Sequence, residues 1–217
     1  MKLKTILLFL TVLAASLTAH ADEHSLDKPW EVGATFNPFV GTGTPTNDMI
    51  GAGIVVKRAI SDKAKVAFGL DMFSGFDFER PAETLGIQQA TGIKAIDATG
   101  DKTSFSLWYE GALSETIERG FYWKAGASLG LVDVGTASGA TASGGTFNIS
   151  TDAGTEFAVL AGIGYSASLT ENLNFNASFD VQENFADWTL TDSVSGASGS
   201  VGNYLTYGLR IGFNYRW

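Results

Sequence analysis

Apolar residues alternate with small or polar residues along most of this chain, in eight separate stretches. The last stretch is the most regular, with Leu209, Ile211, Phe213, Tyr215 and Trp217 alternating with Gly208, Arg210, Gly212, Asn214 and Arg216. A period of two places alternate side chains on opposite faces of an extended strand. The pattern therefore predicts an all-β chain with strands over residues 30–37, 50–57, 65–72, 105–110, 121–130, 156–166, 173–182 and 208–217.

The connections between these stretches alternate between short and long. Short polar turns cover residues 61–64, 114–118 and 170–172, and long connections cover residues 41–49, 79–102, 134–152 and 186–203. This alternation puts the turns at one end and the loops at the other, as in an eight-stranded antiparallel up-and-down transmembrane β-barrel. The stretches 136–145 and 193–202 are rich in Ser, Gly, Ala and Thr, so we expect them to be solvated loops of low complexity.

The polar face of the strands carries few charges, and they are balanced. The five acids are Glu31, Asp71, Glu110, Glu156 and Asp180, and the five bases are Lys57, Lys65, Lys124, Arg210 and Arg216. A soluble ligand-carrying barrel would show this face to water and would carry more charge there. Each base facing lipid near mid-membrane would cost about 2–4 kcal/mol. The charges are therefore expected to point into the lumen of a membrane barrel.

The register suggests which of these charges meet. Glu110 and Lys124 flank one turn almost symmetrically, Glu31 and Arg216 lie near the same rim, and Asp180 and Arg210 lie on adjacent strands. We expect these three pairs to form ion pairs, because isolated charges are costly in a low-dielectric interior. The alternative is a set of separate, solvated charges in a wet lumen.

Aromatic residues gather near the turn ends of the predicted strands. Six of them are Trp30, Tyr109, Trp123, Tyr165, Tyr215 and Trp217. Tyr and Trp favour the membrane–water interface, where the ring is buried and the polar atom stays wet. These six are predicted to form a girdle at that interface.

The first 21 residues predict a secretory signal peptide. Lys2 and Lys4 precede a short apolar run, and the segment ends in Ala19-His20-Ala21. The run is too short to span a bilayer as a helix, which argues against an uncleaved anchor. We therefore expect residues 22–217 to form one exported barrel domain.

Composition excludes several kinds of chemistry. The chain has a formal net charge of −9, no Cys and only two His. The negative charge disfavours nucleic-acid binding, and the missing Cys excludes thiolate metal sites. Asp77, Glu79, Asp187 and Asp192 are expected to be solvated loop acids. We expect no catalytic site, cofactor or metal.

The C-terminal strand resembles the closing strand of bacterial outer-membrane barrels, with alternating apolar residues that end on an aromatic. The whole expected mature chain is similar in architecture to the small eight-stranded group that includes outer membrane proteins A, X and W and the opacity proteins. The resemblance implies an outer-membrane location, contact with lipids and lipopolysaccharide, and a monomer. It also implies that Leu209, Ile211, Phe213, Tyr215 and Trp217 form the signal for the barrel-assembly machinery.

Two functions are open at this point. One is a structural or surface-interaction role through four external loops, with a possible surface or host ligand. The other is a narrow porin-like channel for ions or small solutes. An eight-stranded lumen is narrow enough to be filled by side chains, whereas the many inward glycines leave room for water.

Overall fold

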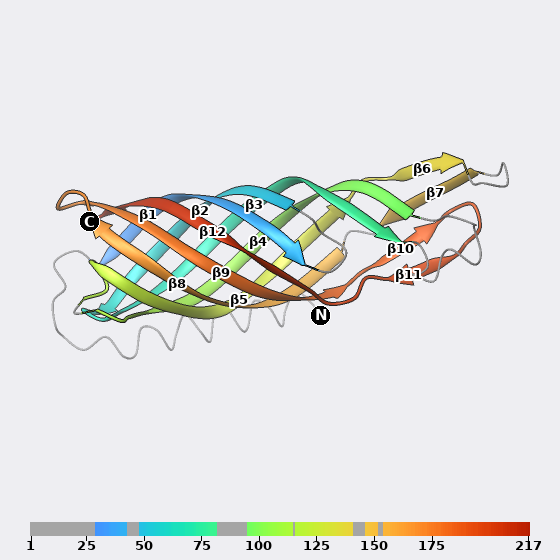
Figure 1. Ribbon diagram of the computed structural model, residues 1–217. Helices are drawn as coiled ribbons and strands as arrows, with labels where there is room; N and C mark the ends of the chain where they lie inside the picture. The colour runs from blue at the N-terminus through green and yellow to red at the C-terminus, as the bar shows by residue number, and fades with distance from the viewer. Residues whose placement is uncertain (1–28, 43–47, 82–94, 115, 141–145, 152–153) are drawn as a thin grey trace.

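The computed structural model describes residues 29–42, 48–81, 95–114, 116–140, 146–151 and 154–217 (Figure 1). The predicted signal peptide lies outside these residues. The described chain contains twelve strands: β1 (Trp30–Thr42), β2 (Asp48–Ser61), β3 (Ala64–Pro81), β4 (Ala95–Ala112), β5 (Gly120–Val134), β6 (Ala137–Ala140), β7 (Thr146–Thr151), β8 (Gly154–Ser168), β9 (Leu173–Asp187), β10 (Thr189–Asp192), β11 (Ser198–Ser200) and β12 (Tyr204–Arg216).

Eight of these strands form a closed antiparallel barrel. Their order around the barrel is β1-β12-β9-β8-β5-β4-β3-β2, and β1 returns to pair with β2. The first and last barrel strands close the cylinder, with Glu31 opposite Arg216 and Phe36 opposite Ile211. The predicted eight-stranded barrel is confirmed. None of the described residues forms a helix of the length and apolar character required to cross a membrane.

Burial alternates along the barrel strands with the period that the sequence predicts. On β12, for example, the Arg210 side chain is buried, whereas Leu209 on one side of it is 46% exposed. The apolar face therefore points outward and the polar face points inward. An outward apolar band around buried charges is the surface expected when lipid, and not water, surrounds a barrel.

The four remaining strands form a second sheet, which we call the extension sheet. Its order is β11-β10-β7-β6. It projects beyond the end of the barrel at which the long connections lie (Figure 1). The expectation that 136–145 and 193–202 are only loops is therefore wrong for the residues of these stretches that belong to β6 and β11. The signal was a short alternation, in which Phe147 and Ile149, and then Trp188 and Leu190, are separated by polar residues.

Strands β3 and β4 are longer than the sequence pattern indicated. They pair as far as Pro81 opposite Ala95, across an irregularity between Phe73 and Phe76. The predicted loop 79–102 is correspondingly shorter. As a result Lys102, which the alternation pattern left in the loop, lies inside the barrel and is buried.

Candidate functional site

The lumen of the barrel is filled by charged and polar side chains. All ten charged residues that the sequence assigned to the inner face are buried, and Lys102 joins them. These residues come from all eight barrel strands. How the charges pair decides whether the lumen is a channel or a packed interior.

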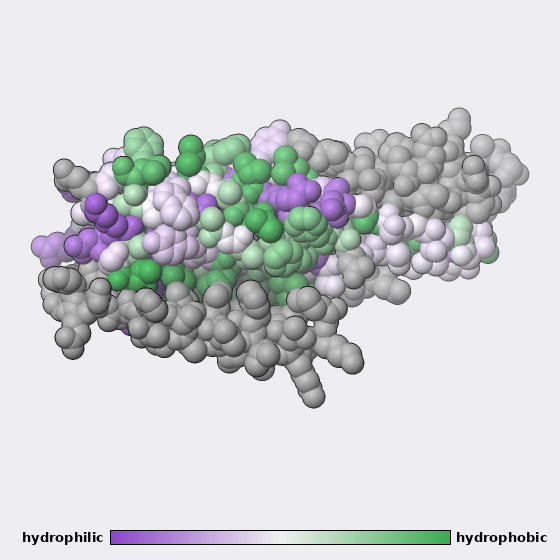
Figure 2. Space-filling model, turned by 90° about the horizontal axis from the view of Figure 1, so that it is seen from below, coloured by the Kyte–Doolittle hydropathy of each residue, from purple (hydrophilic) through white to green (hydrophobic). Residues whose placement is uncertain are grey.

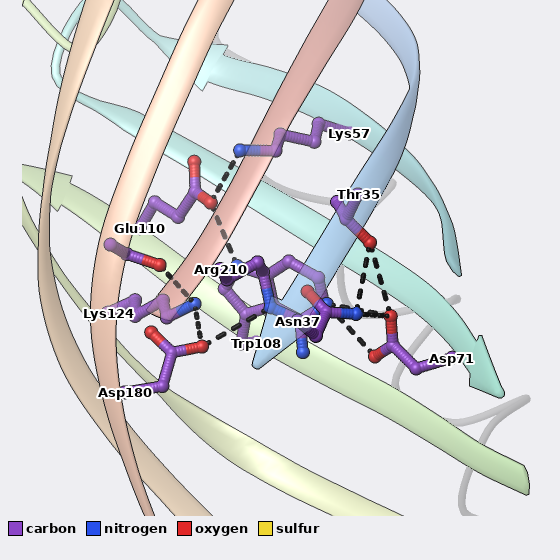
Figure 3. A network of polar contacts seen from close by, with 10 residues as sticks. Thr35, Asn37, Lys57, Asp71, Trp108, Glu110, Lys124, Asp180 and Arg210 are labelled. Carbon is purple, nitrogen blue, oxygen red and sulfur yellow. Dashed lines mark hydrogen bonds and ion pairs between the residues drawn. The ribbon is translucent and has the colours of Figure 1, made fainter. Parts of the chain in front are cut away.

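A central cluster of four charges crosses the lumen (Figure 3). Arg210 donates from Nη1 to both carboxylate oxygens of Asp71 at 2.9 Å, and from Nε to Asp180 at 3.2 Å. Lys124 binds the same Asp180 oxygen at 2.5 Å. Asn37 donates to Asp71 at 2.8 Å. Two bases and two acids therefore pair with one another, and they tie β12 to β3 on one side and to β9 and β5 on the other.

A second pair lies beside the central cluster. Lys57 Nζ is 2.7 Å from Glu110 Oε1, and the Trp108 indole N–H donates to the same oxygen at 2.8 Å. The Lys124 ammonium lies 5.3 Å from the centroid of the Trp108 ring, and the Arg210 guanidinium lies 5.2 Å from the same centroid. These are cation–π distances. Trp108 therefore links this pair to the central cluster and occupies the middle of the lumen.

Toward the turn end of the barrel, the Glu31 carboxylate accepts hydrogen bonds from three side chains. Lys65 lies at 2.7 Å, Asn174 at 3.1 Å and Asn214 at 3.2 Å. Nearer the mouth, Arg216 pairs with Glu118 at 2.5 Å, and Glu118 is the partly exposed member of that pair. The turn that carries Glu118 also buries Ile117, so this turn covers part of the mouth.

Toward the loop end, Lys102 forms an ion pair with Glu156. Tyr204 donates its hydroxyl to Glu156 at 2.5 Å, and Lys102 donates to Asn184 at 3.2 Å. The alternation pattern could have placed Lys102 inward if the strand had been extended past Phe105, because Lys102 has the parity of Ser104 and Ser106.

Only one of the three predicted ion pairs forms. The Asp180–Arg210 pair is confirmed, but Glu110 binds Lys57 in place of Lys124, and Glu31 binds Lys65 in place of Arg216. The predicted partners do lie directly opposite one another in the register. In each of the four lysine pairs, however, the ammonium reaches an acid two strands away. A narrow cylinder brings such side chains together, because they converge toward its axis.

Small residues on the intervening strand make these crossings possible. Gly162 on β8 lies opposite both Lys124 and Asp180. A Cβ at Gly162 would lie 2.8 Å from Asp180 Oδ1 and 3.1 Å from Lys124 Cε. Gly130 on β5 lies opposite Glu156 and Ser104. A Cβ at Gly130 would lie 2.7 Å from Glu156 Cγ and 3.1 Å from Lys102 Cε.

The expectation that inward glycines leave room for water is wrong where large side chains fill that room. A Cβ at Gly69 would meet the Trp108 ring at 2.8 Å, and a Cβ at Gly164 would meet the Tyr122 ring at 2.4 Å. One cavity of about 10 Å³ lies between Lys57, Trp108 and other inner-face residues, which is roughly the space of a single water molecule.

The charges balance within each group. The central cluster pairs two bases with two acids, and every other group pairs one base with one acid. Buried charges are tolerated when they are paired and hydrogen-bonded in this way. Among the described residues, the lumen charges therefore cancel once Glu118 at the mouth is counted as the partner of Arg216.

An apolar cluster, which we call the apolar cap, lies at the loop end of the lumen. The barrel contributes inward residues of β1, β2, β3 and β5, and the extension sheet and its flanks contribute the rest. Its buried members are Phe39, Met49, Phe73, Val132, Val134, Ile149, Trp188, Leu190 and Val201. The rings of Phe39 and Phe73 pack edge-on, with centroids 5.9 Å apart. The apolar cap therefore joins the extension sheet to the barrel and covers the charged lumen.

The six aromatic residues of the predicted girdle lie on the outer face. Tyr109 and Trp123 pack with ring centroids 5.3 Å apart, and Arg58 lies over the Trp30 ring at 5.3 Å. Tyr215 and Trp217 are about half exposed. The five residues of the predicted assembly signal share this face of the C-terminal segment.

One of the four acids that the sequence analysis expected to be solvated, Asp192, is buried. It accepts hydrogen bonds from the Ser195 hydroxyl at 2.6 Å and from the backbone N–H groups of Asn148, Val194 and Ser195. Burial alone would raise the pKa of Asp192, but these donors outweigh it and hold that pKa below its usual value. The expectation that Asp192 is solvated is therefore wrong.

The side chains of Asp77, Glu79 and Asp187 lie outside the described part of the structure. Within the described part, no group of three or more His, Asp or Glu residues is placed to hold a metal ion.

No protein-family model and no curated protein sequence matches this chain. Among solved structures, a major outer membrane protein from Thermus thermophilus is similar, with a TM-score of 0.52, 13% identity, and coverage of 88% of this chain and 99% of that chain. OprG from Pseudomonas aeruginosa is similar with a TM-score of 0.49 and 12% identity, and the match covers 88% of this chain and 96% of OprG. For Ail, the attachment invasion locus protein of Yersinia pestis, the TM-score is 0.45 and the identity 14%, and the match covers 88% of this chain and 97% of Ail. The chain therefore has the fold of bacterial outer-membrane β-barrels.

Proposed function

We propose that this protein is a non-enzymatic, monomeric barrel of the bacterial outer membrane that does not conduct. Its role is to hold the extension sheet at the cell surface, where this sheet contacts other surface molecules. The six girdle aromatics would lie at the periplasmic interface, and the five apolar residues of the C-terminal segment would guide assembly. Lipids and lipopolysaccharide would surround the apolar wall.

One observation carries this proposal: the interior is closed by two layers. Ion pairs that are neutral within each group fill the lumen, and the apolar cap covers them at the loop end. A water-filled channel needs a continuous polar path, which an apolar layer interrupts. The apolar cap also buries Leu190 and Ile149 of the extension sheet, so the same cluster holds that sheet in place.

The test is single-channel recording on protein refolded into planar lipid bilayers, with a large porin as a positive control. We expect no reproducible conductance steps from the wild-type chain. Reproducible steps that change on substitution of lumen residues would overturn the closed-lumen proposal and favour the second candidate, a narrow pore. The observation behind that candidate is the small cavity beside Lys57 and Trp108.

Membrane location needs its own test. The expressed protein should remain with the outer-membrane fraction after carbonate and urea washes, and its electrophoretic mobility should shift on heating, as expected of a folded barrel. Recovery from the wash fractions without detergent would contradict the proposed location.

A further inference from the structure

The extension sheet has two unlike faces. One face buries Ile149 and Leu190 in the apolar cap. On the opposite face, the described side chains carry hydroxyl or amide groups, and the exposed ones are Ser138, Thr146, Asn148, Ser150, Thr189, Ser198 and Ser200. We call these seven residues, with the half-buried Thr191, the hydroxyl face.

Strand pairing aligns the hydroxyl face in rows. Thr191 lies opposite Ser150 on one side and Ser198 on the other. Thr189 lies opposite Ser200, and Ser138 lies opposite Asn148. Neighbouring strands are roughly 4.8 Å apart, so each row places hydrogen-bonding groups at a regular short spacing.

The hydroxyl face is free of charge, although the whole chain has a formal net charge of −9. The sequence has no charged residue from 134 to 150, and from 188 to 204 it has only Asp192. Asp192 is buried, and its carboxylate binds the turn that follows β10. On the side shown in Figure 2, the described atoms of the extension sheet are mostly pale with a few green ones, whereas the barrel carries strongly hydrophobic and strongly hydrophilic groups.

The hydroxyl face is also held in position. The apolar cap packs against the buried face of the sheet, and the hydrogen bonds of Asp192 fix the turn between β10 and β11. Groups that are already ordered lose less entropy when they bind a partner.

We propose that the hydroxyl face binds uncharged saccharide chains. This inference rests on the proposed function, which places the face outside the outer leaflet, where sugar chains of lipopolysaccharide lie. Hydroxyl and amide groups both donate and accept hydrogen bonds, as sugar hydroxyls do. A charge-free face matches a neutral chain, whereas an anionic lipid surface is bound by Lys and Arg. Protein interfaces use aromatic and Arg anchors, and none of the residues of the hydroxyl face is of these types.

Contacts of this kind are individually weak. Saccharide chains anchored in the same membrane are present at a high effective concentration, and repeated units allow several rows to engage at once. Weak contacts are therefore sufficient at that place.

The test uses protein refolded in detergent and native electrophoresis in gels that contain dextran, mannan or galactan. We expect at least one of these neutral polymers to retard the wild-type protein. Dextran sulfate, the charged comparison, should not retard the protein more than that neutral polymer does. A variant with Thr191→Val, Ser150→Ala and Ser198→Ala removes the hydroxyls of one row. Its association constant should fall at least about tenfold, since each lost hydrogen bond accounts for roughly 2- to 10-fold and three hydroxyls are removed.

The matched control replaces hydroxyls on the outer barrel wall, with Thr103→Val and Thr155→Val, and should bind as the wild type does. Circular dichroism and the heat-dependent mobility shift confirm that every variant is folded. The proposal is overturned if none of the three neutral polymers retards the protein, if dextran sulfate retards it more, or if the row variant binds like the control. None of these results bears on membrane location, which the fractionation test decides separately.

Discussion

The lumen and the apolar cap close the same cylinder by opposite chemistry. The lumen is filled by ion pairs whose members come from particular strands, such as Lys57 on β2 with Glu110 on β4. The apolar cap is filled by side chains such as Phe39 and Leu190, which require close packing but no particular partner atom.

The difference shows how each region contributes to the fold. Removal of one member of a buried ion pair leaves an uncompensated charge, whereas replacement of both members by uncharged residues is often nearly neutral. We therefore expect the lumen to specify which strands meet, and the apolar cap to supply the burial that holds the extension sheet.

The largest expected effect is the loss of one lumen charge. Lys57→Met leaves Glu110 without its 2.7 Å partner and should lower the free energy of unfolding by about 3–5 kcal/mol. The double variant Lys57→Met with Glu110→Gln should recover most of this loss, because no unpaired charge remains. Urea unfolding in lipid vesicles measures both variants. Equal losses in the single and double variants would contradict the assigned pairing.

A change in the apolar cap should act on the extension sheet and not on the barrel. Leu190→Ala removes buried apolar volume, which costs about 2–5 kcal/mol at a site that cannot collapse. Hydrogen exchange should show lost protection in β7, β10 and β11, with protection in β8 and β12 unchanged. Loss of protection throughout the barrel would mean that the two regions unfold as one unit.

The crossing glycines allow a finer test of the lumen. Gly162→Ala places a Cβ 2.6 Å from the Phe179 carbonyl oxygen and 2.8 Å from Asp180 Oδ1, so it should cost about 1–3 kcal/mol through overpacking. Gly202→Ala is the matched control, since nothing lies within 4 Å of its added Cβ. Urea unfolding of both variants should show a loss only for Gly162→Ala.

The sequence predicted the barrel well because its alternation is long and repeated on eight strands. It placed ten buried charges on the correct face for the same reason. It predicted one of the three ion pairs, Asp180–Arg210. It missed the other two because register identifies the residue directly opposite, whereas a lysine such as Lys124 reaches past Gly162 to Asp180 on the next strand. That choice depends on side-chain length and on the curvature of the closed cylinder.

The extension sheet was missed for a different reason. Its strands are three to six residues long, and they stand among Ser, Gly and Thr residues that are typical of loops. Only Phe147, Ile149, Trp188 and Leu190 mark a buried face there. So short an alternation becomes informative only when inward residues of the barrel, such as Phe39 and Phe73, supply the apolar surface that it covers.

The smallest expected effect concerns the acid that closes the turn of the extension sheet. The pKa of Asp192 is lowered in the folded state by four hydrogen bonds that outweigh its burial. A lowered pKa contributes stability above the unfolded value, and this contribution is lost as the pH falls through the folded value. The amide signals of Asn148, Val194 and Ser195 should therefore titrate together in NMR spectra, with a midpoint below that of an ordinary aspartate.

Asp192→Asn should abolish this titration and weaken the extension sheet by about 1 kcal/mol, while the lumen pairs remain intact. Hydrogen exchange in β10 measures the loss, and single-channel recording shows that the lumen stays closed. A midpoint at or above the usual aspartate value would show that the four donors do not stabilise the carboxylate. Acid would then act on the barrel and on the extension sheet through the lumen charges alone, and the two regions would no longer differ in their response to pH.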